Sequence, residues 1–94
     1  MRRIPRKDAN HSAIVRTLQS CGAIVHDCAA FGGGFPDIMT SFKGRIMLLE
    51  IKDGSKSPSA RKLTPDERRF HLLWSEHVAV VENEIEAMKA IGAI

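Results

Sequence analysis

The fold is decided by one stretch of the chain, Gly34-Phe-Pro-Asp-Ile-Met-Thr-Ser-Phe-Lys-Gly-Arg-Ile-Met-Leu-Leu-Glu-Ile-Lys52. It contains two strand-like segments, residues 37–42 and 45–52, which lie on either side of Lys43-Gly44. Glycine in a two-residue connection can adopt the positive φ that a tight hairpin needs. The stretch therefore predicts a β-hairpin.

This turn also determines which residues of the two strands face each other. Counting outward from it sets Asp37 opposite Glu50, and cross-strand neighbours have Cβ atoms about 4.5–5.5 Å apart. Because side chains alternate along a strand, Lys52 lies on the same face as Glu50. The hairpin is thus predicted to hold two acids and a lysine at one edge.

Charged residues at the end of an apolar strand need a reason, because burying a charge costs several kcal/mol unless it is paired or bound to a metal. Two carboxylates this close repel unless a cation lies between them, and oxygen ligands suit Mg²⁺ or Mn²⁺. Such an ion activates water and stabilises charge on a phosphate, while Lys52 can orient the nucleophile or offset charge. The pattern predicts phosphodiester hydrolysis. A surface ion cluster is the simpler interpretation of the same residues.

The segment before the hairpin predicts one helix and one short strand. Asp8 or Asn10 can cap a helix that ends near Ser20. Its apolar stripe consists of Ile14, Val15 and Leu18. Residues 23–29 are β-branched at their start and predict a strand, which leads to the glycine run at 32–34, where a loop begins.

The segment after the hairpin predicts a connection, a helix, a strand and a closing helix. Residues 53–62 are rich in Gly, Ser, Pro and Lys and predict a mobile, solvated connection. Thr64 caps a helix that is expected to run to about Glu76 and to bury Phe70, Leu73 and Trp74. Residues 78–81 predict a strand and residues 83–91 a helix with an apolar stripe of Ile85, Met88 and Ile91.

The resulting order, α-β-β-β-α-β-α, predicts an α/β domain. A hairpin-bearing sheet with a crossover helix and one more strand gives a mixed central β-sheet flanked by helices, with the last strand parallel to an earlier one. The 94 residues are enough for one domain, expected at 8–94 after a basic flexible arm at 1–7. A chain this short buries only about 60–65% of its unfolded surface, which makes it a candidate homodimer.

Composition indicates a soluble protein without a membrane span. Hydrophobic residues make up 44% of the chain, and no apolar run approaches the length of about 18–20 residues that crosses a bilayer. The basic N-terminus is not followed by the apolar segment of a secretory signal, so the expected location is the cytoplasm. Cys21 and Cys28 lack zinc-site spacing and are expected to be buried free thiols. Core or surface roles are expected for His26, His71 and His77.

Lysines and arginines gather in two segments, residues 2–7 and 56–69. Local positive charge attracts phosphate more than the modest net charge of +3 does. The candidate DNA contacts are Arg2, Arg3, Arg6, Lys7, Lys56, Arg61, Lys62, Arg68 and Arg69. Solvated basic faces explain the same segments without a nucleic acid.

Three blocks of the sequence resemble the VRR-NUC domain, a branch of the PD-(D/E)XK nuclease superfamily. They are Gly34-Phe-Pro-Asp37, Leu49-Glu-Ile-Lys52-Asp-Gly54 and Leu63-Thr-Pro-Asp-Glu-Arg-Arg-Phe-His71. The resemblance spans the chain from Asp8 onward, and the chain is similar to stand-alone phage and prophage members of this family. It implies a restriction-endonuclease-like core, a metal held by Asp37, Glu50 and the Ile51 carbonyl, and Lys52 as the catalytic lysine.

The same resemblance implies an activity and partners. Stand-alone members look like Mg²⁺- or Mn²⁺-dependent DNA endonucleases that act as homodimers on branched or structured DNA, such as four-way junctions or flaps. The expected location is then the cytoplasm of a bacterial or phage-infected host cell. Two other interpretations stay open. One is a non-catalytic DNA-binding module that keeps the nuclease fold, and the other is a small interaction subunit unrelated to nucleic acid.

Two positions depart from the family pattern. Many members carry a glutamate on the first helix where this chain has Ala13, and the candidates to substitute for that acid are Asn10, His11 and Asp8. Members often carry glutamine at the position of Glu67. This glutamate either reaches the site as a catalytic residue or only favours the N-terminus of its helix.

Overall fold

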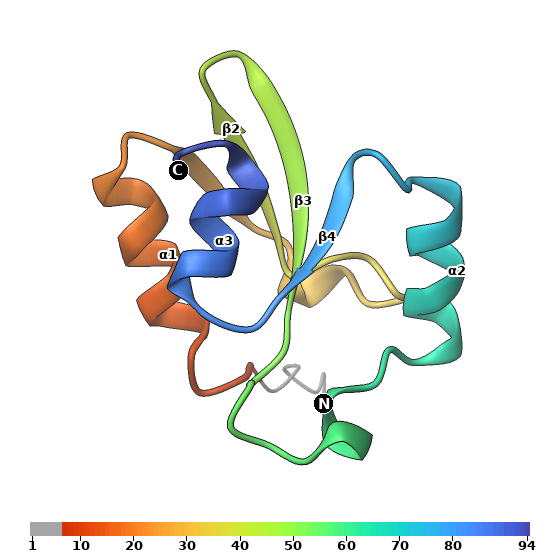
Figure 1. Cartoon of the computed structure of the whole chain (residues 1–94). Coiled ribbons are helices and arrows are strands. Elements are labelled where there is room, and N and C mark those ends of the chain that lie inside the picture. Colours follow the sequence, from red (N-terminus) through yellow and green to blue (C-terminus); the bar gives the residue numbers. More distant parts are fainter. Residues whose placement is uncertain (1–6) are drawn as a thin grey trace.

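The structure is a computed structural model that describes residues 7–94. In chain order its elements are α1 (His11–Ser20), β1 (Ile24–Asp27), η1 (Ala29–Phe31), β2 (Ile38–Phe42), β3 (Arg45–Ile51), η2 (Pro58–Arg61), α2 (Pro65–Leu73), β4 (Val78–Val81) and α3 (Glu84–Ile91), where η marks a short 3₁₀ helix (Figure 1). The predicted order of helices and strands is confirmed. The predicted N-terminal arm lies, apart from Lys7, outside the described residues.

The four strands form one sheet in the order β1-β2-β3-β4. The first three are antiparallel and β4 runs parallel to β3, so the predicted mixed sheet is confirmed. Phe42 pairs with Arg45, and the turn residues Lys43 and Gly44 have φ values of 49° and 78°. Positive φ at both central residues matches the right-handed twist of the flanking strands, which is why this short turn closes the hairpin.

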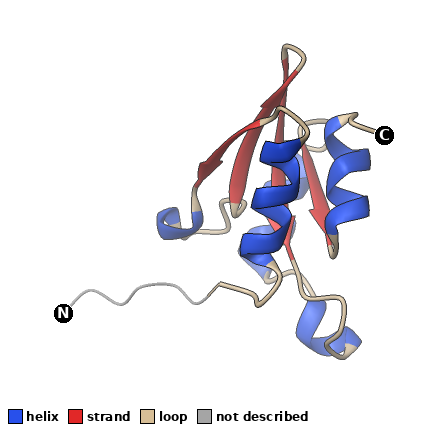
Figure 2. Ribbon diagram, turned by 90° about the vertical axis from the view of Figure 1, so that its left-hand side faces the viewer, coloured by secondary structure: helices blue, strands red, loops and turns tan. Residues whose placement is uncertain are grey.

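Two helices, α1 and α3, cover one face of the sheet, and α2 lies on the other side (Figures 1 and 2). The covered face takes every second residue of β2 and β3, including Ile38, Leu49 and Ile51, and packs them against the helices. The predicted stripe residues Ile14 and Leu18 are buried there. In α3 the prediction for Ile85 is wrong, because Ile85 is 57% exposed and Ala87 is buried instead.

The expectation for α2 is wrong in two respects, because the helix ends at Leu73 instead of near Glu76 and because its apolar side is not buried. The helix forms, but it buries none of its residues: Leu73 is 75% exposed, and Trp74, which follows its last turn, is 47% exposed. It is attached through stacked and edge-on aromatic rings, with Phe35 and Phe70 centroids 5.3 Å apart and Phe70 and Trp74 centroids 5.4 Å apart. An apolar stripe shows which side of a helix is apolar, but burial also requires another surface that packs against this side. The core helices lie on the other face of the sheet, so they do not cover α2.

Two smaller predictions can be compared with the structure. Both cysteines are free, as expected, with Cys28 buried but Cys21 only half-buried. Within residues 7–94 no helix is long and apolar enough to cross a membrane.

Candidate active site

The hairpin brings Asp37 and Glu50 together, as the register predicts. Ile38 pairs with Leu49, so the next residue outward on each strand is one of the two acids. Asp37 does not extend the strand. Its Oδ2 instead accepts a hydrogen bond of 2.7 Å from the backbone N–H of Ile51, while its carbonyl accepts one of 2.8 Å from the N–H of Cys28. These bonds hold the carboxylate beside the end of β3.

Glu50 is a buried acid without a full set of partners. It is only 4% exposed, and its Oε1 is buried with no hydrogen-bond partner among the described residues. Burial, together with the negative charge of Asp37, raises the pKa of Glu50 to about 9. The carboxyl group is therefore neutral at pH 7 in the protein alone, and a cation at this position would favour its ionised form.

Lys52 lies between two acids from different elements. Its Nζ is 3.7 Å from Glu50 Oε2 and 3.0 Å from Glu67 Oε1. Burial alone would lower the pKa of Lys52, but the hydrogen bond to Glu67 and the negative charges of Glu67 and Glu50 hold this pKa above its usual value. Lys52 is thus a fixed cation rather than a proton acceptor at neutral pH.

Glu67 both contacts Lys52 and caps its own helix. Its Oε1 accepts a 2.9 Å hydrogen bond from the backbone N–H of Thr64, while its own N–H donates to Thr64 Oγ1, so a capping box starts α2. The same oxygen accepts the hydrogen bond from Lys52. The first turn of α2 therefore positions the lysine.

These side chains line one open cavity of about 330 Å³. Its wall includes Asp37, Glu50, Lys52 and Glu67 together with the glycine loop, Phe35 and Ala60 of η2. Gly34 is required in that loop, because a Cβ there would lie 2.5 Å from the backbone carbonyl carbon of Asp66, and its φ is +85°. Close contact between the loop and α2 brings the two sides of the cavity together.

The structure separates the three candidates for the missing helix acid. Asp8 lines the cavity, with Oδ1 3.3 Å from the Nζ of Lys56. Asn10 uses its amide nitrogen to bridge the carbonyls of Lys52 and Glu82, at 3.0 and 2.9 Å. His11 is directed at Asp27 instead. Of the three, Asp8 alone lines the cavity that contains Asp37 and Glu50.

A divalent cation fits the donors that are present. In the part of the chain that the structure describes, no three His, Cys, Asp or Glu side chains lie close enough to hold a metal by themselves. Mg²⁺ commonly binds through one or two carboxylates and keeps several waters. Asp37 and Glu50 provide two carboxylates. The N–H of Ile51 donates to Asp37, and in a strand the carbonyl of a residue points to the same side as its N–H, so the Ile51 carbonyl is on the side of Asp37.

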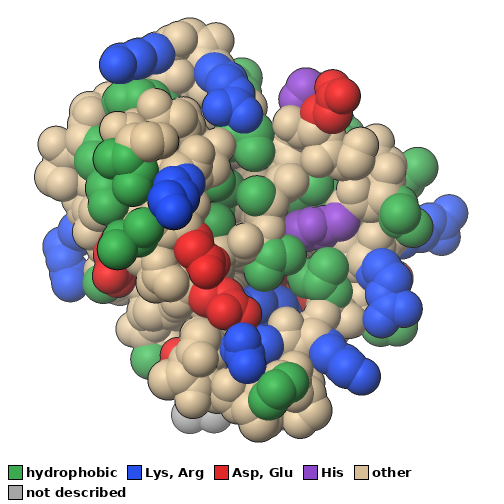
Figure 3. All heavy atoms as spheres, viewed as in Figure 1, with side chains coloured by type: hydrophobic (Ala, Val, Ile, Leu, Met, Phe, Trp, Pro, Cys, Tyr) green, Lys and Arg blue, Asp and Glu red, His purple; other side chains and the backbone are tan. Residues whose placement is uncertain are grey.

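The basic candidates divide into three groups. Arg2, Arg3 and Arg6 lie outside the described residues. Three others form ion pairs: Lys7 with Asp27, Lys56 with Asp8, and Arg61 with Glu82. The rest are exposed and form no ion pair with residues 7–94: Lys62, Arg68 and Arg69. Figure 3 shows lysine and arginine side chains on the surface around η2 and α2, the region of these residues.

His71 is closer to the site than the sequence suggested. It is half-buried, four residues after Glu67 on α2, which puts the two on one side of the helix. Burial lowers the pKa of His71, the charge of Glu67 opposes this, and Lys52 adds to it. In the sequence, the four-residue spacing between Glu67 and His71 was the signal that could have placed His71 near the site.

No model of a known protein family, no curated protein and no solved structure matches this chain. The site is therefore interpreted from its residues and their geometry, together with the sequence resemblance.

Proposed function

We propose that the protein is a metal-dependent DNA endonuclease with a PD-(D/E)XK core of the VRR-NUC type. The observation that carries this proposal is the grouping of Asp37, Glu50 and Lys52 in one open cavity, with a buried oxygen of Glu50 left without a partner. Two facing acids next to a fixed cation have no evident structural purpose, since the negative charge of Asp37 raises the pKa of Glu50.

The chemistry follows from the charges. Asp37, Glu50 and the Ile51 carbonyl would hold Mg²⁺ or Mn²⁺, which when bound supplies an activated water and neutralises charge on the phosphate. Lys52, kept protonated by Glu67, offsets the negative charge that develops on the phosphate during hydrolysis. Glu67 is thus a positioning residue, because it acts through Lys52.

The proposed substrate is branched or otherwise structured DNA. Lysine and arginine side chains that contact phosphates recognise DNA through its backbone and shape and do not read its bases. Lys62, Arg68 and Arg69 are exposed and lie close in the chain to Ala60 and Glu67, which line the cavity. They are suited to phosphate contacts outside the catalytic cavity.

We propose a second copy of the chain as the protein partner. An apolar groove of about 400 Å³ lies between α2 and the sheet face opposite the core helices, lined by Phe35, Met39, Ile46, Leu48, Trp74 and His77. Exposed apolar surface of this kind marks association sites, and a two-fold junction calls for two active sites. Sedimentation should detect a dimer that Ile46→Glu reduces to monomer; a monomeric parent protein at working concentration would overturn this.

The test of the function is a cleavage panel. Linear, flapped and four-way DNA are incubated with Mg²⁺ or Mn²⁺ and either the parent protein or Lys52→Ala. The parent is expected to cut at least one branched DNA, and the variant to cut none while keeping its fold by circular dichroism. Absence of cleavage by the parent on every substrate, or normal cleavage by the variant, would refute the proposal.

One observation favours a second candidate, a non-catalytic DNA-binding module that keeps the nuclease fold. Ala13 replaces the helix acid, and no third acid among residues 7–94 is close enough to complete a metal site by itself. This candidate predicts DNA binding that is independent of metal and is not followed by cleavage. The same panel, read by electrophoretic mobility, separates the two.

A further inference from the structure

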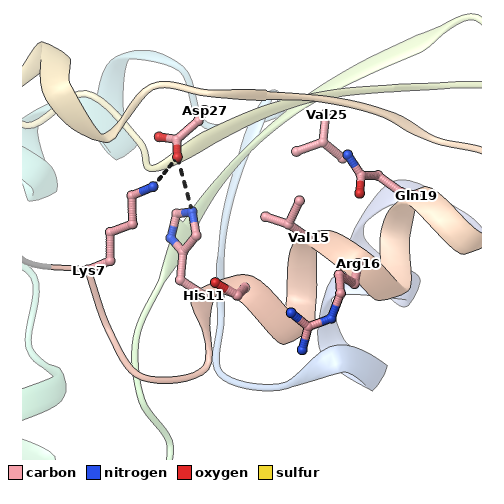
Figure 4. Close-up of a pocket in the computed structure, with 8 residues that line it drawn as sticks. Lys7, His11, Val15, Arg16, Gln19, Val25 and Asp27 are labelled. Atoms are coloured by element: carbon pink, nitrogen blue, oxygen red, sulfur yellow. Dashed lines mark hydrogen bonds and ion pairs between the residues drawn. The ribbon is translucent and has the colours of Figure 1, made fainter.

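A second cavity, of about 380 Å³, lies between α1 and β1 (Figure 4). Its polar lining comes from Lys7, His11, Ser12, Arg16, Gln19 and Asp27. It is adjacent to the catalytic cavity along the chain in two places. In the first, Lys7 directly precedes Asp8, which lines the catalytic cavity. In the second, Asp27 Oδ1 accepts a 2.9 Å hydrogen bond from the N–H of Ala29, which also lines the catalytic cavity.

His11 is a buried polar group without a hydrogen-bond partner. It is 4% exposed, and its Nε2 has no partner among the described residues, since the nearest acid oxygen, Asp27 Oδ2, is 3.6 Å away. In Figure 4 the side chains of Lys7 and His11 both point at Asp27 from the opposite side of the cavity. Leaving such a group unpaired is unfavourable, so a ligand that reorganises this cluster would recover part of the lost free energy.

The N-terminus of α1, at the same end of the cavity, is not neutralised. Asn10 occupies the cap position, but its side chain bonds the carbonyls of Lys52 and Glu82 and does not cap the helix. The first turn contains no acidic residue. Free N–H groups and the helix dipole at such an end favour an anion, above all a phosphate.

The net charge of the residues that line the cavity is opposite to that of a phosphate. Lys7 and Arg16 are positive and Asp27 is negative, which leaves a net positive cavity before His11 is counted. Arg16 is exposed on α1 and forms no ion pair with residues 7–94, so its guanidinium is available for a bidentate contact. Lys7 is held by Asp27 and can be shared between this acid and a phosphate.

We propose that this cavity binds an internal phosphate of the DNA backbone, on the strand that continues past the catalytic cavity. Arg16 and Lys7 contact the phosphate oxygens at the N-terminus of α1, and Asp27 and His11 position Lys7. The identity of the ligand as DNA rests on the proposed function. Of its two cations, Lys7 belongs to the basic segment at residues 2–7, whereas Arg16 adds a contact on α1 outside both basic segments.

The experiment compares Arg16→Gln with Lys43→Gln, a matched change at the hairpin turn at the other end of the sheet. Binding to a four-way DNA is measured across a salt series, with and without 5′-phosphates, in the cleavage-silent Lys52→Ala background without metal. Arg16→Gln is expected to weaken binding about tenfold and to lower the salt slope by about one, whether or not the DNA carries 5′-phosphates. Lys43→Gln is expected to leave both unchanged.

The outcomes are distinct from those of the cleavage panel. Equal binding and equal slopes for the two glutamine variants would overturn the subsite even if the parent cuts DNA. A loss that occurs only with 5′-phosphorylated DNA would overturn the internal-phosphate assignment in favour of a strand end. The predicted loss in a protein that cuts nothing would support the subsite and remove only the endonuclease proposal.

Discussion

The two faces of the sheet are built from the same strands but serve different purposes. Beneath α1 and α3, alternate residues such as Ile38, Leu49 and Ile51 form a closed apolar core. On the opposite face the intervening residues include Glu50, Ile46 and Met39, and α2 covers them only in part. Because side chains alternate along a strand, one hairpin can supply a stable core and an open, charged cavity without compromising either.

The difference shows where each kind of residue is tolerated. On the core face a charge would be excluded from water with no partner, at a cost of several kcal/mol. On the open face Glu50 is buried, but it lies beside Lys52 and a cavity through which a cation can enter. Changes on the two faces should therefore affect different properties of the protein.

The largest expected effect is on catalysis. Glu50→Gln keeps the shape of the side chain but can no longer ionise when a cation binds, so DNA cleavage should fall at least about 10³-fold while the fold is retained. Product formation on the best branched substrate measures the effect, and Lys43→Gln is the control. Cleavage within tenfold of the parent would break the assignment of the open face to chemistry.

The next effect separates stability on the two faces. Leu49→Ala removes a fully buried side chain and should lower the free energy of unfolding by about 2–5 kcal/mol. Leu73→Ala, on exposed α2, should lower it by less than about 0.5 kcal/mol. Urea unfolding of both variants provides the comparison, and equal losses would contradict the open position of α2.

A substitution at the contact between the two regions should have an intermediate effect. In Gly34→Ala the new Cβ would meet the backbone of Asp66, and the residue would have to keep a positive φ. A loss of about 1–3 kcal/mol is expected, together with weaker cleavage, because the loop and α2 can no longer close the cavity wall. Gly44→Ala has a positive φ but nothing within 4 Å, so it controls for backbone strain alone.

The last prediction is a pH dependence of the free energy of unfolding, and it comes from Glu50. Its pKa is about 9 in the folded protein against 4.5 for the free side chain, so folding favours the protonated form. Its contribution is complete below pH 4.5 and is lost as the pH rises towards 9, at no more than about 1.4 kcal/mol per pH unit. Urea unfolding in a chelator across this window should show the decline in the parent and a flatter profile in Glu50→Gln.

Local patterns accounted for most elements and for the principal acids. The Lys43-Gly44 turn set the hairpin register, and that register brought Asp37 to Glu50. Thr64 and Glu67 marked the start of α2 through their capping box. These features depend on residues close together in the chain, where geometry is fixed by a few bonds.

The misplaced residues have a common cause. Leu73 and Trp74 are on an apolar stripe, and Ile85 has helical spacing, yet all three are exposed. Arg16, which lines the second cavity, carried no signal of a site in the sequence, and His11 was expected only as a substitute for the missing helix acid. Periodicity identifies which side of a helix is apolar, but it does not identify which surface, if any, will face that side.

By itself the sequence determined the order of the elements, the hairpin and the two facing acids, because backbone preferences and turn chemistry act over a few residues. Tertiary structure alone decided that Glu67 holds Lys52, that Asp8 lines the cavity of Asp37 and Glu50 while Asn10 and His11 do not, and that α2 stays open. Those contacts join segments distant in the chain, and their geometry depends on how whole elements pack.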